Sequence, residues 1–290
     1  MDQFIANGLC TGAVYALVAL GFALIYTTSG VFHIAHGAAY TAAGYALYSF
    51  LTVLRLPFVL SVALAVLATA SLGALFEVAV YRPLNATHAS PAVLMISSLG
   101  LYIIVINLIA TFWGNETRTF SSQGQPSVTI GDVILTRVQI AQVLASIGVG
   151  ALYWTFLRKS RLGRLCRAVA DDSTLASVLG IDVGLTRVVA FFIGSSLAAI
   201  GAVLVALDVG MDPYVGFSAV LAAAVACIVG GLHRFIAPAL GGALLGVVQS
   251  LTVWRTSTRW ESAVVFAILI VFLLFRPQGL LGMTKRIEER

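Results

Sequence analysis

Long hydrophobic runs separated by short polar segments dominate this sequence. An α-helix needs about 20 mostly apolar residues to cross a bilayer, and nine runs approach that length. They cover approximately residues 4–28, 31–54, 57–80, 91–112, 138–157, 187–208, 217–232, 237–254 and 260–275. The seventh and eighth are short for a full crossing, so either could be a broken or re-entrant segment. The pattern predicts an all-α protein, a polytopic transmembrane helical bundle of about 8–10 spans.

Composition agrees with a membrane protein. Of the 290 residues, 60% are hydrophobic and 10% are charged, whereas soluble domains carry about 25% charged residues. The spans and their connections use most of the chain, so we expect one integral domain over residues 1–290. The residues after Met1 lack the basic stretch of a cleavable signal peptide, and the first run is expected to remain as a helix. The three cysteines have no paired spacing, which gives no sign of a disulfide or a metal site.

The basic residues predict the orientation. If the polar segment at about 158–186 faces the cytoplasm, twelve of the seventeen Lys and Arg residues lie inside and five outside, as the positive-inside rule expects. The amino terminus is then outside and the carboxyl terminus is cytoplasmic. The net charge of +5 reflects this topology and does not indicate a nucleic-acid partner. The longest external segment, 113–137, is either a solvated loop or a cover over the outer face.

Small residues predict close helix packing. Glycine and alanine are dense in the first two spans, which lets helix backbones approach closely in lipid. Residues 12–25 also resemble residues 194–207. Two related halves are common in transporters, but chance similarity between two helices rich in Ala, Leu and Gly explains the likeness equally well.

The few polar groups near the spans are the candidates for a translocation path. His33 and His36 open the second span three residues apart, while Asn107 lies in the fourth span and Gln249 in the eighth. No Cys, Asp or Glu falls close to the histidines in sequence, so we expect them to be interfacial and bonded to the backbone rather than to a metal. The two amides are expected to form interhelical hydrogen bonds.

Carboxylates are expected where water or a basic partner reaches them. Glu77, five residues before Arg82, is expected to form a local ion pair, and Asp208 and Asp212 fall at predicted outer ends of spans. No chain of buried carboxylates or histidines crosses the membrane in the sequence, so no coupling-ion site is evident. The sequence also contains no phosphate-binding loop for ATP. If transport is active, its energy must come from another subunit.

The segment at about 158–186 is the longest polar interruption with a helical pattern of its own. Five basic residues fall within ten positions, and apolar residues follow near helical spacing. Asp172 is expected to cap a second short helix after a break near 171–172, and Gly180 is expected to end it. Arg167 and Asp171, four residues apart, could pair across the first helix. Such an amphipathic segment either docks in the groove of a partner or rests on lipid headgroups.

Short motifs occur in a characteristic order along nearly the whole chain. The loop holds Arg167-Ala168-Val169-Ala170-Asp171-Asp172, then Ala176 and Gly180-Ile181. The others are Gly12-Ala13-Val14-Tyr15-Ala16-Leu17, Ala35-His36-Gly37, Tyr81-Arg82-Pro83-Leu84, Ser98-Leu99-Gly100, Gly230-Gly231-Leu232 and Phe275-Arg276-Pro277-Gln278-Gly279-Leu280-Leu281-Gly282. As a collinear set, they resemble the permease subunits of the branched-chain amino-acid ABC importer family, of the high-affinity Liv type.

The resemblance implies a transport subunit of a bacterial inner membrane and not an enzyme. Its partners would be a second related permease subunit, two cytoplasmic ATPase subunits that bind the ATP, an extracytoplasmic solute-binding protein and membrane lipid. It implies no cofactor or metal held by this chain. The loop would couple the ATPases to the helices through Arg167, Asp171, Asp172, Ala176 and Gly180.

The sequence departs from the family pattern at three places. His33-Ile34 stands where members commonly have Asn-Phe, Ala222 where many have Lys, and His233-Arg234 where small residues are usual. The cargo therefore stays open between a branched-chain amino acid, another amino acid, urea and an amide. The alternative function is a stand-alone secondary carrier or channel for a small polar solute such as urea or an amide. An intramembrane enzyme or scaffold would require a polar cluster at one depth, which the sequence does not indicate.

Overall fold

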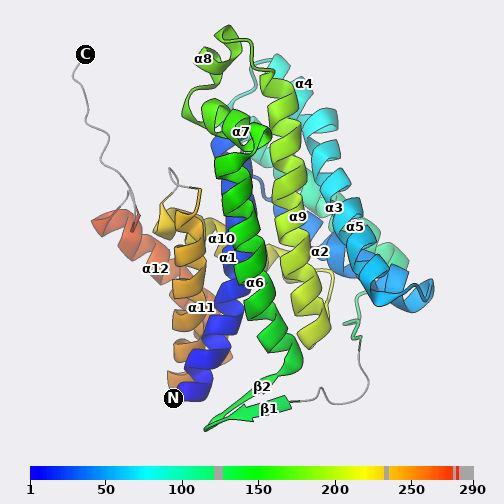
Figure 1. Ribbon diagram of the computed structural model, residues 1–290, viewed down its shortest axis with the longest axis vertical. Coiled ribbons are helices and arrows are strands. Elements are labelled where there is room, and N and C mark those ends of the chain that lie inside the picture. The colour runs from blue at the N-terminus through cyan, green and yellow to red at the C-terminus, as the bar shows by residue number, and fades with distance from the viewer. Residues whose placement is uncertain (121–126, 232–234, 277–278, 281–290) are drawn as a thin grey trace.

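The computed structural model describes residues 1–120, 127–231, 235–276 and 279–280. Helices make up nearly all of this part (Figure 1), and the predicted polytopic helical bundle is confirmed. Several residues named in the motifs lie outside the described residues: Leu232, His233, Arg234, Pro277, Gln278, Leu281 and Gly282.

The helices follow the predicted spans. The first half of the chain forms α1 Asp2–Ser29, α2 Ala35–Tyr48, the π-helical turn η1 Ser49–Val53, α3 Phe58–Phe76, the π-helical turn η2 Glu77–Tyr81, α4 Arg82–Ala86 and α5 Pro91–Trp113. The strands β1 Ser127–Ile130 and β2 Val133–Thr136 come next. The second half forms α6 Arg137–Lys159, α7 Arg161–Asp171, α8 Ser173–Val178, α9 Val183–Val209, α10 Val215–Gly230, α11 Ala237–Arg255, the 3-10 turn η3 Thr258–Trp260 and α12 Glu261–Phe275.

Seven of the described helices are long and apolar enough to cross a membrane. The other two predicted spans are shorter, because α2 has 14 residues before η1 and α10 has 16. A helix of 16 residues is about 24 Å long, less than the roughly 30 Å of the hydrocarbon core. Of the two spans predicted to be marginal, α10 is thus the short one, while α11 is a continuous helix of 19 residues.

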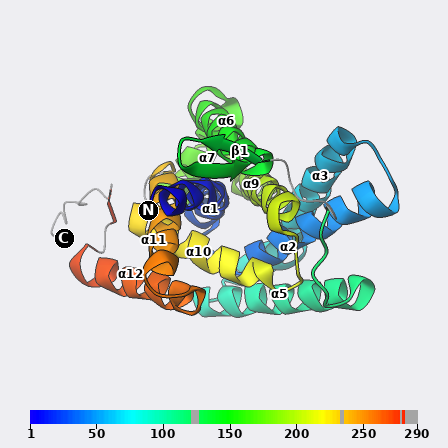
Figure 2. The same ribbon diagram turned by 90° about the horizontal axis from the view of Figure 1, so that it is seen from below.

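The central helix α1 packs along its length against α9 and α11 (Figure 2). Its glycines permit this contact: Gly12 lies against the backbone of α11, and Gly21 faces Gly194 of α9 so closely that a Cβ on either would overlap the other's carbonyl. Close backbone approach is how helices associate in lipid, where apolar surface alone provides little drive. The two similar segments, 12–25 and 194–207, are therefore direct packing partners.

The two ends of the bundle carry different elements. α7 and α8 lie at one end, and the amino terminus and the β1–β2 hairpin lie at the other (Figure 1). The all-α prediction misses this antiparallel hairpin, because its strands are only four residues long. Gln3 ties the hairpin to α1, donating to the Ile134 carbonyl and accepting from the Ile134 N–H, both at 2.8 Å. Arg118 and Met211 exchange two backbone hydrogen bonds. The stretch that follows α5 is therefore attached to the α9–α10 connection.

Candidate functional site

The polar segment at 158–186 folds as two helices with a break between them. α7 ends at Asp171 and α8 begins at Ser173, while Asp172 between them is extended with φ −157° and ψ 106°. The Asp172 carboxylate accepts hydrogen bonds from the N–H groups of Thr174 (2.8 Å) and Leu175 (2.9 Å). These bonds satisfy two of the donors that a helix start leaves free. The predicted break and the predicted N-cap are both confirmed.

Gly180 ends α8, as its place in the sequence predicts. Its φ of +82° lies in the left-handed region, which favours glycine. The Gly180 N–H donates to the Ser177 carbonyl and the Ile181 N–H donates to the Ala176 carbonyl, each at 3.0 Å. This pair of bonds is the Schellman motif, which satisfies the last carbonyls of a helix. Both ends of α8 are therefore fixed by local hydrogen bonds.

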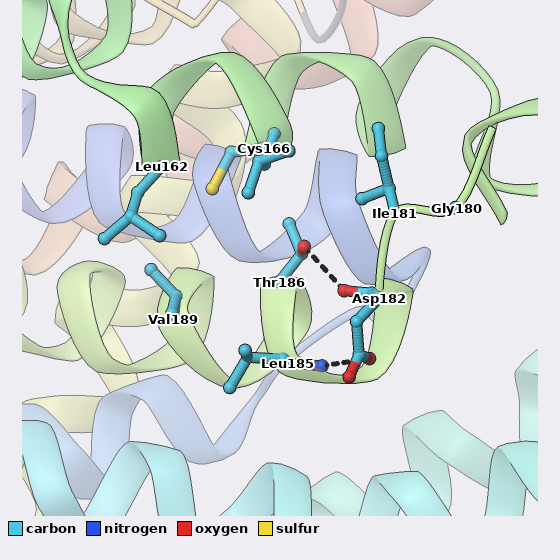
Figure 3. A pocket seen from close by; sticks show the side chains of 9 residues that line it. Leu162, Cys166, Gly180, Ile181, Asp182, Leu185, Thr186 and Val189 are labelled. Carbon is cyan, nitrogen blue, oxygen red and sulfur yellow. Dashed lines mark hydrogen bonds between the residues drawn. The ribbon is translucent and has the colours of Figure 1, made fainter.

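The helix α9 starts directly after this turn. Asp182 caps it by accepting a hydrogen bond from the Leu185 N–H at 2.9 Å (Figure 3). A cavity of about 180 Å³ lies between α7 and the first turns of α9, and its mostly apolar lining includes Leu162, Cys166 and Val189 (Figure 3). Protein interiors are normally close-packed. The α7–α9 contact is thus incompletely filled, which leaves room for α7 to shift against α9.

Beside this cavity, α7 is held against the bundle at Cys166 and Gly163. Cys166 is fully buried in a cluster with side chains of α1, α6 and α9, and burial raises the pKa of its thiol to about 11. Gly163 allows the sharp turn from α6 into α7, because a Cβ there would overlap the backbone of Phe156 and Leu157. α7 is therefore anchored on α6 and can transmit displacement into the bundle.

The short helix α8 presents an apolar face away from the bundle. Leu175 is 56% exposed, Val178 78% and Leu179 72%, whereas Ala176 is buried on the inner side. The helix α8 lies at one end of the molecule, beyond the long helices of the bundle (Figure 1). Clustered exposed apolar side chains on a polar segment mark an interaction surface. We call Leu175, Val178 and Leu179 the α8 apolar face.

Arg167 and Asp171 do not pair as predicted. Among the residues that the structure describes, the two side chains form no ion pair, and the buried Nε of Arg167 has no hydrogen-bond partner. Asp171 is exposed and is the last residue of α7. The free carbonyls of a helix end repel a carboxylate, which disfavours an inward-facing Asp171.

The two histidines are buried within the protein. His33 and His36 are both 0% exposed, because the rings of Tyr81 and Phe191 pack against His33 and that of Phe22 packs against His36. His33 Nδ1 lies 2.9 Å from the Tyr81 hydroxyl, and His36 Nε2 lies 3.3 Å from the Val18 carbonyl. The second nitrogen of each ring has no partner in the described part of the chain. Only His36 therefore meets the backbone, and neither histidine is fully satisfied.

Glu77 is a buried carboxylate on the same π-helical turn as Tyr81, which contacts His33. It is 1% exposed, and its Oε2 atom has no hydrogen-bond partner. The predicted ion pair with Arg82 is not formed among the described residues. Glu77 and Tyr81 bound the π-helical turn η2, whose wider spacing rotates side chains away from the positions that an α-helix predicts. Sequence reasoning named Glu77 but did not predict its burial.

The remaining path candidates lie apart from the histidines. Asn107 is exposed on α5 and donates to the Ile103 carbonyl of its own helix at 2.8 Å. Gln249 is buried on α11, and its Oε1 has no partner among the described residues. Neither amide makes the predicted interhelical bond, because a carbonyl one turn back is nearer for Asn107 and no donor reaches Gln249. In the described ranges, no three His, Cys, Asp or Glu side chains gather as a metal site.

A tight bundle of membrane-length helices with one structured helical loop at an end is the architecture of a polytopic membrane permease. The chain belongs to the family described as branched-chain amino acid transport system / permease component, whose model matches residues 4–273. The family predicted from the sequence motifs is confirmed.

Individual relatives agree with the family assignment. The chain is 31% identical to the high-affinity branched-chain amino acid transport system permease protein BraD of Pseudomonas aeruginosa, over 97% of this chain and 95% of that protein. It is 30% identical to the corresponding protein LivH of Escherichia coli, with the same coverage. Among solved structures, PsaBC from Streptococcus pneumoniae in complex with Fab matches with a TM-score of 0.54, over 95% of this chain and 93% of that chain. At 13% identity, this last likeness concerns the fold alone.

Proposed function

We propose that this chain is the membrane-spanning subunit of an ABC importer and that α7 and α8 receive the motion of partner ATPases. The observation that carries the proposal is the helix–break–helix loop, capped at both ends of α8, with the exposed α8 apolar face. A short helix with an apolar face fits a groove on a partner protein. Membership of the permease family supports the same assignment.

The coupling residues have distinct roles in this proposal. Asp172 and Gly180 make α8 a defined unit through their caps, and Ala176 lets α8 lie close to the bundle. Asp171 is exposed and Arg167 is partly exposed, so both side chains can meet a partner. A push on α8 passes through Gly180 into α9, which has 27 residues and is about 40 Å long.

The assembled importer would contain more than this chain. We infer a second related permease subunit, two cytoplasmic ATPase subunits that bind ATP, and an extracytoplasmic solute-binding protein, in a bacterial inner membrane. The amino terminus and the hairpin would face outward and α7–α8 would face the cytoplasm, which agrees with their opposite ends in the fold (Figure 1). This chain would supply no ATPase site and no cofactor.

The cargo is proposed to be a branched-chain or related amino acid, because the relatives are named for branched-chain amino-acid transport. His33, His36, Asn107 and Gln249 stay candidates for the path. Among these candidates, Asn107 is exposed on the surface of the bundle, on α5. It would suit a path shared with the second permease subunit.

The substitution Val178→Asp tests the docking of the ATPases. Val178 is 78% exposed, so the change leaves the packing of this chain intact and places a charge in the α8 apolar face. We expect the ATPase subunits no longer to copurify with the permease and ATP-driven uptake in proteoliposomes to be lost. The matched control is Thr87→Asp, which adds the same charge at an exposed position on the connection after α4.

Two results would contradict the proposal. Full ATPase copurification with Val178→Asp would show that α8 is not the docking element. Uptake by liposomes that contain this chain alone, driven by an ion gradient, would favour the stand-alone carrier instead.

A further inference from the structure

A second cavity lies at the end of the bundle that carries the hairpin. It has a volume of about 220 Å³ and is enclosed by α1, α2, α6, α9 and α10. Its polar lining is formed by Thr11, Tyr15, Tyr40, Gln142, Asp208 and Ser218. One water occupies roughly 30 Å³ in the liquid, so the cavity has room for a small organic solute as well as for waters.

Asp208 is the charged group of this cavity. The Thr136 hydroxyl donates to Asp208 Oδ1 at 3.3 Å, and the Gln142 amide donates to Asp208 Oδ2 at 3.5 Å. Gln142 is held in place, since it also donates to the Leu204 carbonyl at 3.1 Å. Both donors are neutral, and Asp208 forms no ion pair within the described part of the chain. The carboxylate is thus oriented by hydrogen bonds while its charge is left without a partner.

The rest of the lining suits a positively charged nitrogen. Tyr15 and Tyr40 are among the residues that line the cavity, and aromatic rings attract cations that lie over their faces. Thr11 and Ser218 bring hydroxyl oxygens, which can accept the N–H bonds of an ammonium that the carboxylate does not take. A carboxylate within a membrane-spanning segment is a functional candidate by default. The oriented carboxylate, the hydroxyl groups and the aromatic residues of the lining all favour one class of ligand, a small ammonium compound.

We propose that this cavity binds the primary ammonium group of the transported solute, with Asp208 as its charge partner. The inference rests on the proposed function and deepens it, because it favours an amino acid over urea or an amide as cargo. Asp208 lies at the last turn of α9, and the coupling loop joins the first turn of the same helix. A displacement of α9 by the loop would therefore move the carboxylate relative to α1, α2 and α10.

The test compares ligands that differ in one group, using the purified full-length chain in lipid nanodiscs. L-leucine and 3-methylbutylamine carry the ammonium, while 4-methylpentanoate is leucine without its amino group and urea is neutral. The midpoint of thermal unfolding is measured at millimolar ligand and constant ionic strength, because a ligand that binds the folded chain raises it. We expect the two ammonium compounds to raise the midpoint, and 4-methylpentanoate and urea to leave it unchanged.

Asp208→Asn is the decisive variant, because the amide oxygen can still accept from Thr136 while the negative charge is removed. We expect at least tenfold weaker binding of both ammonium compounds. Asp212→Asn is the matched control: Asp212 accepts from the Tyr214 N–H at 2.8 Å, is not part of the cavity lining, and its replacement should leave binding unchanged. Normal unfolding without ligand in both variants establishes that the fold is retained.

Three outcomes would overturn the ammonium site. These are no shift with either ammonium compound in the wild-type chain, an equal shift in Asp208→Asn, or an Asp208-dependent shift with sodium chloride of the same size, which would make it an alkali-cation site. The assay contains no ATPase subunit. Its failure is therefore separable from a failure of the importer proposal, which the Val178→Asp copurification tests.

Discussion

The two ends of α9 meet their surroundings in opposite ways. At the Val183 end, the helix is joined through Gly180 to the exposed α8 apolar face. At the Val209 end, it carries Asp208 into a polar cavity enclosed by five helices. An exposed apolar face is typical of a protein–protein contact, while a small cavity with a few convergent polar groups is typical of a small-molecule site.

The helix α9 connects the α8 apolar face at one end of the bundle to the cavity at the other. The middle of α9 is packed against α1 through the Gly21–Gly194 contact, so the helix has little freedom to bend. A displacement of the whole helix then moves both of its ends, which lie about 40 Å apart for 27 residues. Substitutions in the middle of α9 should have the largest effects. Those at its loop end should have smaller effects, and those that report on the packing of α7 the smallest.

Gly194→Val should disturb both ends at once. A Cβ at Gly194 would lie 2.7 Å from the Gly21 carbonyl oxygen, closer than real contacts allow, and overpacking typically costs about 1–3 kcal/mol. We expect a clear drop in the thermal unfolding midpoint, together with loss of ATPase copurification and of ammonium binding. Gly148→Val is the control, because a Cβ at Gly148 on α6 meets nothing within 4 Å. Equal stability of the two variants would show that the α1–α9 contact is not what holds α9.

Gly180→Val should disturb the loop end alone. The residue has φ +82°, and a β-branched residue pays roughly 1–2 kcal/mol or more in the left-handed region. ATP-driven uptake should fall strongly, while ammonium binding at the other end of α9 should persist. Gly180→Asn should recover much of the uptake, since Asn tolerates this conformation. Loss of ammonium binding in Gly180→Val would mean that the two ends are not separable.

Asp172→Ala should loosen α8 without unfolding the chain. The change removes two capping bonds, and loss of an N-cap typically costs about 1 kcal/mol. Amide hydrogen exchange of residues 173–179 should become faster, with a smaller loss of uptake than in Gly180→Val. Asp172→Ser keeps a capping oxygen and should restore protection. Asp171→Ala, next to the break but not a cap, should leave the amide exchange of residues 173–179 little changed.

The reactivity of Cys166 measures how tightly α7 packs on the bundle, without a change in α7 itself. Burial raises the pKa of the Cys166 thiol to about 11, which keeps the thiol protonated at pH 8. The thiolate, which is the reactive form, is then about a hundredfold rarer than in the unfolded chain. In a chain with Cys10→Ala and Cys227→Ala, maleimide labelling at pH 8 should be at least that much slower than after denaturation. Labelling as fast as in the unfolded chain would show that α7 is not seated on α6.

The loop was the most predictable part of the molecule. Its break at Asp172 and its end at Gly180 depend on residues within three or four positions, where the capping side chain and the capped N–H are neighbours in sequence. The positions of the spans were predictable for a similar reason, since the length and apolarity of each run are local properties.

The polar sites were predicted less well. His33, His36 and Glu77 are buried because α2, η2 and α9 meet around them, and a π-helical turn altered the facing of Glu77. The predicted bonds of Asn107 and Gln249 depended on partners from other helices, which sequence spacing does not locate. Asp208 was placed correctly at the end of a span, but its cavity is formed by five helices that are distant in sequence.

The sequence by itself determined the number and order of the apolar segments, the capped coupling loop and the family, because these follow from hydrophobic runs, capping residues and short motifs. Only the tertiary structure decided which face of α8 is exposed, which histidine nitrogens lack partners and that Asp208 lines a cavity. The physical reason is that burial and hydrogen bonding of a polar group in a helical bundle depend on what the neighbouring helices bring to it. In lipid those neighbours are selected by close backbone contacts such as Gly21 with Gly194, which exist only once the helices have packed.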